Sequence, residues 1–113
     1  MLKRKLRWIR IFPSLEAMEE QFVGRSSIVH SSMGTTLLLI RTNGNYFAFK
    51  NKCPHQGKSL EGCMVENDAF SCPYHRYKFS LEDGKGHGMN VDKYELKIDD
   101  TGVYVGKLKW TFF

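Results

Sequence analysis

The chain has 113 residues, 42% hydrophobic and 26% charged, which fits one folded domain and leaves no room for a second, catalytic one. Its 17 basic and 12 acidic residues give a formal net charge of +5, but no nucleic-acid-binding motif accompanies them, so no nucleic-acid partner is expected. The longest aliphatic run, Leu37 to Ile40, is far shorter than the roughly 18 residues of a membrane-spanning helix, and no signal peptide is apparent, so we expect a cytoplasmic protein without a transmembrane segment.

The N-terminal ten residues hold five of the basic side chains: Lys3, Arg4, Lys5, Arg7 and Arg10. Two interpretations stay open, a solvated tail that aids solubility and a docking surface for an acidic partner. Within this end, Trp8 to Phe12 alternates well enough to predict a strand. A short connecting helix follows, because Pro13 and Ser14 offer an entry and an N-cap. Its apolar face at helical spacing comprises Leu15, Met18 and Phe22.

The rest of the chain is predicted to be mostly β. Strands are expected at Leu37 to Thr42 and Asn45 to Lys50 because both are rich in β-forming residues and flank Asn43-Gly44, a strong hairpin signal. A second hairpin joins Tyr94 to Ile98 with Val103 to Lys107. Short strands are also predicted at Ala69 to Cys72 and Tyr77 to Leu81.

Between residues 50 and 81 apolar alternation weakens and two short motifs stand out, Cys53-Pro54-His55 and Cys72-Pro73-Tyr74-His75. Each places a soft thiolate and an imidazole on one tight loop, with a proline that restricts the loop beside the cysteine. Three cysteines are an odd number and too few for a disulfide framework. Metal binding by these loops is therefore the main interpretation.

Cys-x-His, sixteen further residues and Cys-x-x-His resemble the signature of the Rieske family, in which two histidines replace two cysteines on one iron of a [2Fe–2S] cluster. Neighbouring residues also match the family: Gly57, Leu60, Phe79 and Gly84. The resemblance implies an all-β fold, a Rieske-like antiparallel β-sandwich or barrel base with an inserted cluster-binding subdomain. It further implies a single domain over residues 1–113, with the subdomain at about residues 51–81.

The resemblance implies that Cys53 and Cys72 hold the inner iron, and that His55 and His75 hold the outer iron near the surface. High-potential Rieske proteins add one cysteine to each loop and join them by a disulfide, but the matching positions here hold Lys58 and Tyr74. Those proteins also have a serine and a tyrosine that donate hydrogen bonds to sulfur. The matching positions here hold Tyr77 and Phe79, and Phe79 has no donor. We therefore expect the low end of the family's range, near about −150 mV.

The remaining Cys and His residues have less specific interpretations. Cys63 is expected to be a small buried thiol, with a redox-sensing thiol as the alternative. His30 and His87 lack a partner at ligand spacing and are interpreted as solvated or structural. Relatives cover the cluster with a third, proline-containing loop, which this chain lacks. Met89 is a candidate apolar substitute there.

The preferred function is that of a soluble Rieske ferredoxin, an electron-transfer protein and not itself an enzyme, which passes single electrons from a reductase to a terminal oxygenase or similar redox enzyme. An alternative is the small redox subunit of a larger enzyme, such as a nitrite-reductase-like assembly. A zinc-binding or sensor module is a third hypothesis, although Cys-x-His is unusual for structural zinc sites. Oxygenase activity is not expected, because its mononuclear iron needs two histidines and a carboxylate, and the chain has no domain to hold them.

Overall fold

The computed structural model of the protein describes residues 2–32, 34–74 and 76–112, and side chains within residues 7–106 of these ranges. The elements in chain order are β1 (Leu2–Phe12), α1 (Leu15–Gln21), β2 (Ser27–Ser32), β3 (Thr35–Thr42), β4 (Asn45–Lys50), β5 (Met64–Val65), β6 (Ala69–Ser71), β7 (Lys78–Ser80), β8 (Lys85–Gly86), β9 (Met89–Asn90), β10 (Lys93–Asp99) and β11 (Gly102–Phe112). Among the described residues, no helix is long and apolar enough to cross a membrane.

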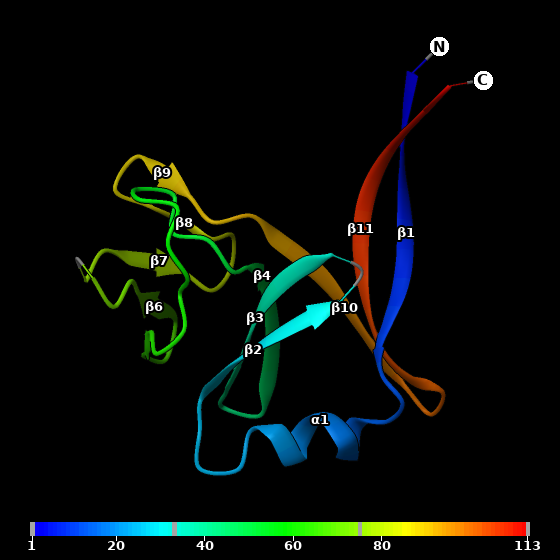
Figure 1. Ribbon diagram of the computed structural model, residues 1–113, viewed down its shortest axis with the longest axis horizontal. Helices are drawn as coiled ribbons and strands as arrows, with labels where there is room; N and C mark the ends of the chain where they lie inside the picture. Colours follow the sequence, from blue (N-terminus) through cyan, green and yellow to red (C-terminus); the bar gives the residue numbers. More distant parts are fainter. Residues whose placement is uncertain (1, 33, 75, 113) are drawn as a thin grey trace.

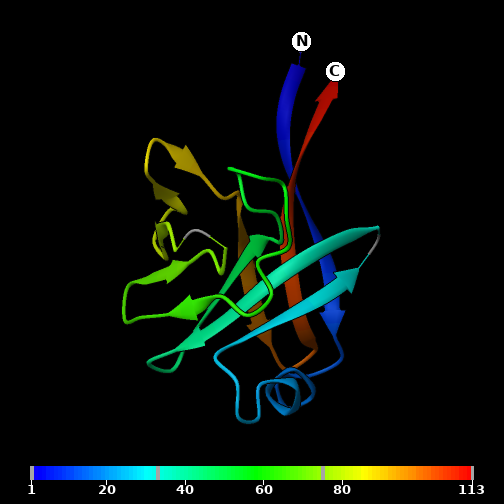
Figure 2. The same cartoon turned by 60° about the vertical axis from the view of Figure 1, so that its left-hand side comes forward.

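The large sheet has the strand order β1-β11-β10-β4-β3-β2, and its paired strands are antiparallel. Thr42 pairs with Asn45, so Asn43 and Gly44 form a two-residue turn, and both have the positive φ that such a turn requires. In the second hairpin Asp99 pairs with Gly102. Figure 2 shows how strongly the sheet twists, since β2 and β3 cross the direction of β1 and β11. The predicted antiparallel all-β fold is confirmed.

The basic N-terminal segment is a strand, β1, and not an unpaired extension. β1 pairs with β11 from Leu2–Phe112 onward, whereas the pairing of β10 with β11 runs from Asp99–Gly102 to Glu95–Gly106. Beyond Gly106, β1 and β11 therefore continue as a two-stranded ribbon that leaves the body of the molecule (Figure 1).

Strand β3 separates two apolar cores. Side chains alternate between the two faces of a strand, and the run Leu37 to Ile40 is buried on both. Leu37 and Leu39 join a core that also contains Met18 and Phe22 of the α1 segment. The N-cap of α1 is as predicted, since the Ser14 hydroxyl accepts the Ala17 N–H at 3.1 Å. Leu38 and Ile40 face the second core.

The second core lies under the inserted unit, which we define as residues 51–92, between β4 and β10. This unit contains two small sheets, β5-β6-β7 and β8-β9, and stands to one side of the large sheet (Figures 1 and 2). An aromatic series joins the two parts, because Phe49 of β4 contacts Phe70 with ring centroids 4.7 Å apart and Phe70 contacts Phe79 at 5.7 Å. Burial of these rings holds the unit on the sheet.

Gly84 anchors the far side of the unit. Its N–H donates to the Ser80 carbonyl and its own carbonyl accepts from the Val91 N–H, at 2.7 and 2.8 Å. Its φ is +75°, and an added Cβ would collide with the Val91 carbonyl oxygen. A side chain there is therefore disfavoured both by backbone conformation and by collision.

We predict that Gly84→Ala destabilises the protein by about 2–4 kcal/mol, of which about 1 kcal/mol comes from the positive φ and the rest from the collision. Gly24→Ala is the matched control, since Gly24 has φ +72° and nothing within 4 Å of the added Cβ. Urea unfolding of both variants measures the difference. Equal destabilisation by the two substitutions would contradict the close approach at Gly84.

Candidate metal centre

The two Cys/His loops have the same backbone hydrogen bonds. In each loop the cysteine N–H donates to the carbonyl five residues later, and the cysteine carbonyl accepts the N–H four residues later. The donor–acceptor pairs are Cys53–Lys58 at 2.7 Å, Gly57–Cys53 at 2.7 Å, Cys72–Tyr77 at 2.9 Å and Arg76–Cys72 at 2.8 Å. The sequence revealed a shared Cys-Pro pair, and the structure extends the likeness over six residues of each loop.

The fourth residue after each cysteine has a left-handed backbone, with φ +70° at Gly57 and φ +57° at Arg76. Glycine adopts this conformation without steric cost, whereas for arginine it costs about 1 kcal/mol. A non-glycine residue kept in this region marks a position where the surrounding structure imposes the conformation. Nothing in the residue type at position 76 predicts this conformation.

The thiols of Cys53 and Cys72 meet at the centre. Both residues are fully buried, and their Sγ atoms lie 3.3 Å apart. This is far longer than a disulfide bond. It approaches the separation of about 3.8 Å expected for two thiolates on one tetrahedral metal with bonds of about 2.3 Å. The structure therefore brings together the two predicted sulfur ligands in an arrangement that fits one shared metal ion.

His55 lies on the first loop and is exposed, which agrees with an outer ligand near the surface. Its ring meets the Tyr77 ring edge-on, with centroids 5.3 Å apart. The fourth predicted ligand, His75, lies outside the described residues. Among the residues that are described, no three His, Cys, Asp or Glu side chains converge as a metal site. Of the four predicted ligands, the structure therefore brings Cys53 and Cys72 together, and His55 lies on the same loop as Cys53.

His87 contacts the second Cys/His loop through Tyr77 and the neighbouring Lys78. The His87 ring stacks on Tyr77 with centroids 4.7 Å apart and an interplanar angle of 26°, and its Nε2 accepts the Lys78 N–H at 3.2 Å. His87 is held at φ +53° between two glycines. These contacts agree with the structural interpretation of His87. Met89, the residue suggested from sequence, is half-buried against the core.

The two loops are also joined at their surface. The Lys58 ammonium lies 4.7 Å from the centroid of the Tyr74 ring, within the range of a cation–π interaction. Lys58 belongs to the first loop and Tyr74 to the second, and both are exposed. Lys58 and Tyr74 occupy the two positions that a disulfide joins in high-potential Rieske proteins, so a non-covalent contact links the loops there.

Cys63 shares the second core with Cys53 and Cys72, whereas His30 lies in the other core. Cys63 is buried in the second core, and burial raises the pKa of its thiol, which favours the inert thiol over a redox-sensing one. His30 lies in β2, half-buried against the Phe12 ring at 4.5 Å, where burial lowers its pKa. His30 therefore belongs to the core around α1 and not to the loops.

The donor set fits an iron–sulfur cluster of the mixed type. Buried thiolates and a surface imidazole are soft and intermediate ligands that suit iron–sulfur clusters and zinc. Burial of both sulfur atoms with the histidine outside matches a site with one inner and one outer metal ion. Cys-x-His spacing is not that of structural zinc sites.

Comparison with curated proteins finds named ferredoxins among the relatives. The chain is 35% identical over 74 residues to the ferredoxin component of an alkene monooxygenase system from Xanthobacter autotrophicus, covering 62% of this chain and 61% of the relative. It is 27% identical over 74 residues to a 3-phenylpropionate/cinnamic acid dioxygenase ferredoxin subunit from Photorhabdus laumondii, covering 61% and 70%. Human apoptosis-inducing factor 3 is 30% identical over 73 residues, but only 12% of its length is covered.

Solved structures share the fold. The ferredoxin of carbazole 1,9a-dioxygenase from Nocardioides aromaticivorans aligns with a TM-score of 0.63 and 20% identity, over 71% of this chain and 83% of that one. A chain of the reduced oxygenase–ferredoxin complex of carbazole 1,9a-dioxygenase aligns with a TM-score of 0.71 and 20% identity, over 88% and 28%. The family model of the Rieske [2Fe-2S] domain matches residues 8–95. This match spans both Cys/His loops and all of β2, β3 and β4, and the protein therefore belongs to the Rieske [2Fe-2S] domain family.

Proposed function

We propose that this protein is a cytoplasmic, soluble ferredoxin that carries single electrons from a reductase to a terminal oxygenase or similar redox enzyme. The observation that carries the proposal is the pair of fully buried thiols 3.3 Å apart, with an exposed histidine on the same loop. Relatives that are named as ferredoxin components of oxygenase systems support it. The aligned region is about three fifths of the alkene monooxygenase ferredoxin.

The proposed ligands are Cys53 and Cys72 for the inner iron and His55 and His75 for the outer iron, within one domain over residues 1–113 whose cluster-binding subdomain spans about residues 51–81. When bound, the [2Fe–2S] cluster supplies a site that accepts one electron and returns it. Both cysteines are fully buried, so water is excluded from the side of the site where they would hold the inner iron. The exposed His55 offers the short path by which an electron reaches a partner across a small interface.

Residues around the loops favour a low reduction potential. Hydrogen bonds donated to sulfur stabilise the reduced state and raise the potential. Phe79 is fully buried in the second core, and its side chain has no hydrogen-bond donor. Lys58 and Tyr74 cannot form a disulfide. We therefore propose a potential near about −150 mV, at the low end of the Rieske range.

A potentiometric titration of the holoprotein tests the function directly. We expect one electron per chain and a midpoint near about −150 mV. Phe79→Tyr should raise the midpoint because it adds a hydroxyl donor near the sulfur atoms, and Phe47→Tyr is a control within the same apolar neighbourhood. A protein that takes up no electron, or one with a midpoint near about −400 mV as in plant-type ferredoxins, would contradict the proposal.

The Lys58–Tyr74 contact yields a second prediction. An exposed cation–π pair contributes about 0.5–1 kcal/mol, so its loss should speed removal of iron by a chelator about two- to fivefold. Lys58→Met and Tyr74→Leu should both show this acceleration, followed by loss of visible absorbance. Lys58→Arg and Tyr74→Phe keep the interaction and should behave like the unmodified protein. If Lys58→Met and Lys58→Arg lose iron at the same rate, the contact does not hold the loops together.

A further inference from the structure

The two ligand loops are basic at the surface. Residues 50–60 and 71–81 contain no acidic residue, and their basic residues are Lys50, Lys52, Lys58, Arg76 and Lys78. Lys78 is neutralised by Glu66 at 3.2 Å. Among the described residues, no acidic side chain lies within 4 Å of the other four. The two loop segments therefore carry four basic side chains that have no salt-bridge partner among the described residues.

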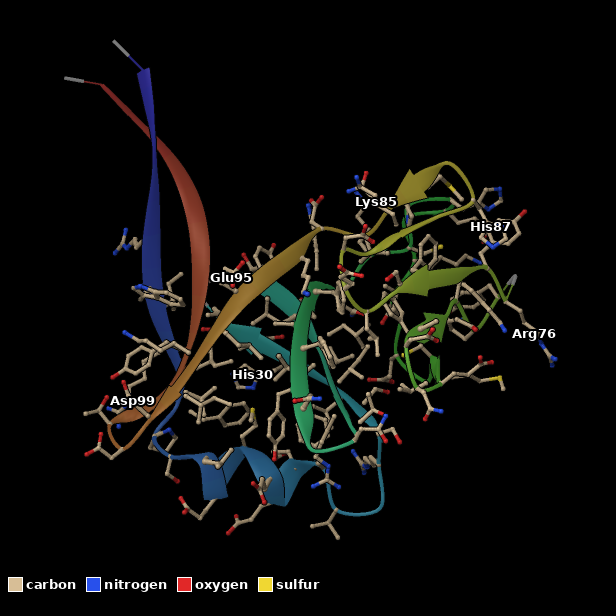
Figure 3. The ribbon with its side chains drawn as sticks, turned by 180° about the vertical axis from the view of Figure 1, so that it is seen from behind. His30, Arg76, Lys85, His87, Glu95 and Asp99 are labelled. Atoms are coloured by element: carbon tan, nitrogen blue, oxygen red, sulfur yellow. The ribbon has the colours of Figure 1, made fainter. Side chains whose placement is uncertain are left out.

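Three of these residues form what we call the basic rim: Lys52, Lys58 and Arg76. Lys52 extends along the first loop, because its Cε lies 3.4 Å from the position of a Cβ added at Gly57. Lys58 lies over Tyr74, between the loops. Arg76 occupies the left-handed position of the second loop, and its side chain projects outward at the far end of the inserted unit (Figure 3). The rim thus spans both loops.

The acidic residues lie outside these two loop segments. Three lie on α1, at Glu16, Glu19 and Glu20, and two lie at the β10–β11 turn, at Asp99 and Asp100. Six others lie in the rest of the inserted unit: Glu61, Glu66, Asp68, Glu82, Asp83 and Asp92. In Figure 3, Asp99 and Arg76 are at opposite ends of the molecule. The unpaired cations of the two loop segments favour a locally positive surface, because salt screens the charges that lie farther away. Such a surface steers oppositely charged partners toward the loops.

We propose that the basic rim, with the exposed half of Tyr74, is the surface that docks a carboxylate-rich face of the redox partner. This inference rests on the proposed function and adds the chemistry of the partner. Tyr74 is 52% exposed, and a half-exposed tyrosine in contact with the Lys58 ammonium has the composition of an interface centre. Arg76 keeps its side chain at a position where glycine would be less strained, which agrees with a role for the guanidinium outside the fold.

The sign of the charge near the site can be measured with small oxidants. Ferricyanide, a trianion, and tris(1,10-phenanthroline)cobalt(III), a trication, each accept one electron from the reduced protein and become ferrocyanide and the cobalt(II) complex. Stopped-flow oxidation by ferricyanide should slow as salt is added, whereas oxidation by the cobalt complex should not slow. Arg76→Glu and Lys52→Glu should each slow ferricyanide about tenfold at low salt and speed the cobalt complex.

Lys97→Glu is the matched control, because Lys97 lies on β10, between Glu95 and Asp99, away from the loops, and the change in net charge is the same. It should leave both rates within about twofold of the unmodified protein. A substitution that changed the reduction potential of the protein would change both oxidation rates in the same direction. Opposite changes in the two rates therefore identify an electrostatic effect of the substituted charge. Shifts in the same direction, or a Lys97→Glu effect equal to that of Arg76→Glu, would overturn the docking surface. A protein that dithionite does not bleach would instead overturn the proposed function.

Discussion

The structure depends on two thiols held 3.3 Å apart in an apolar core. Two neighbouring thiolates in such surroundings repel each other and have lost their hydration, so their ionised forms require a cation between them. The first loop and the chain up to β5, residues 51–63, have no strand or helix among the described residues. Backbone hydrogen bonds around Cys53 and the metal must therefore supply the order that regular structure provides elsewhere. β3 contributes from the other side, since one of its faces completes the core beneath the cysteines.

The features that could be predicted from the sequence are those formed by residues close together in the chain. The Asn43-Gly44 turn, the Ser14 cap and the paired Cys-Pro loops each rest on chemistry within a few residues, and the structure contains all three. The ribbon did not follow from sequence, because residues 2–7 become a strand only by pairing with the far end of the chain. Strands β5, β8 and β9 span two residues each, too short for any alternation to appear.

The candidate site divides in the same way. The meeting of Cys53 and Cys72 could be predicted because cysteine chemistry and spacing indicate a shared site without knowledge of the fold. The stacking of His87 on Tyr77 and the contact of Lys58 with Tyr74 could not, since each joins residues from different loops. The left-handed backbone at Arg76 is hidden for another reason: nothing in an arginine signals positive φ, and only the likeness to the loop around Gly57 explains it. Non-covalent contacts therefore join the two loops, and one of them, between Lys58 and Tyr74, lies where high-potential Rieske proteins have a disulfide.

The ligand set is the central claim, and pulsed electron paramagnetic resonance of the dithionite-reduced protein tests it most directly, with iron and zinc analysis of the same sample. The account predicts two iron atoms per chain and a signal with hyperfine coupling to nitrogen from two histidines, lost from the spectrum when His55 or His75 is replaced. A signal without nitrogen coupling would mean four-sulfur ligation. A silent sample that contains zinc and no iron would contradict the electron carrier and leave a structural metal site in its place.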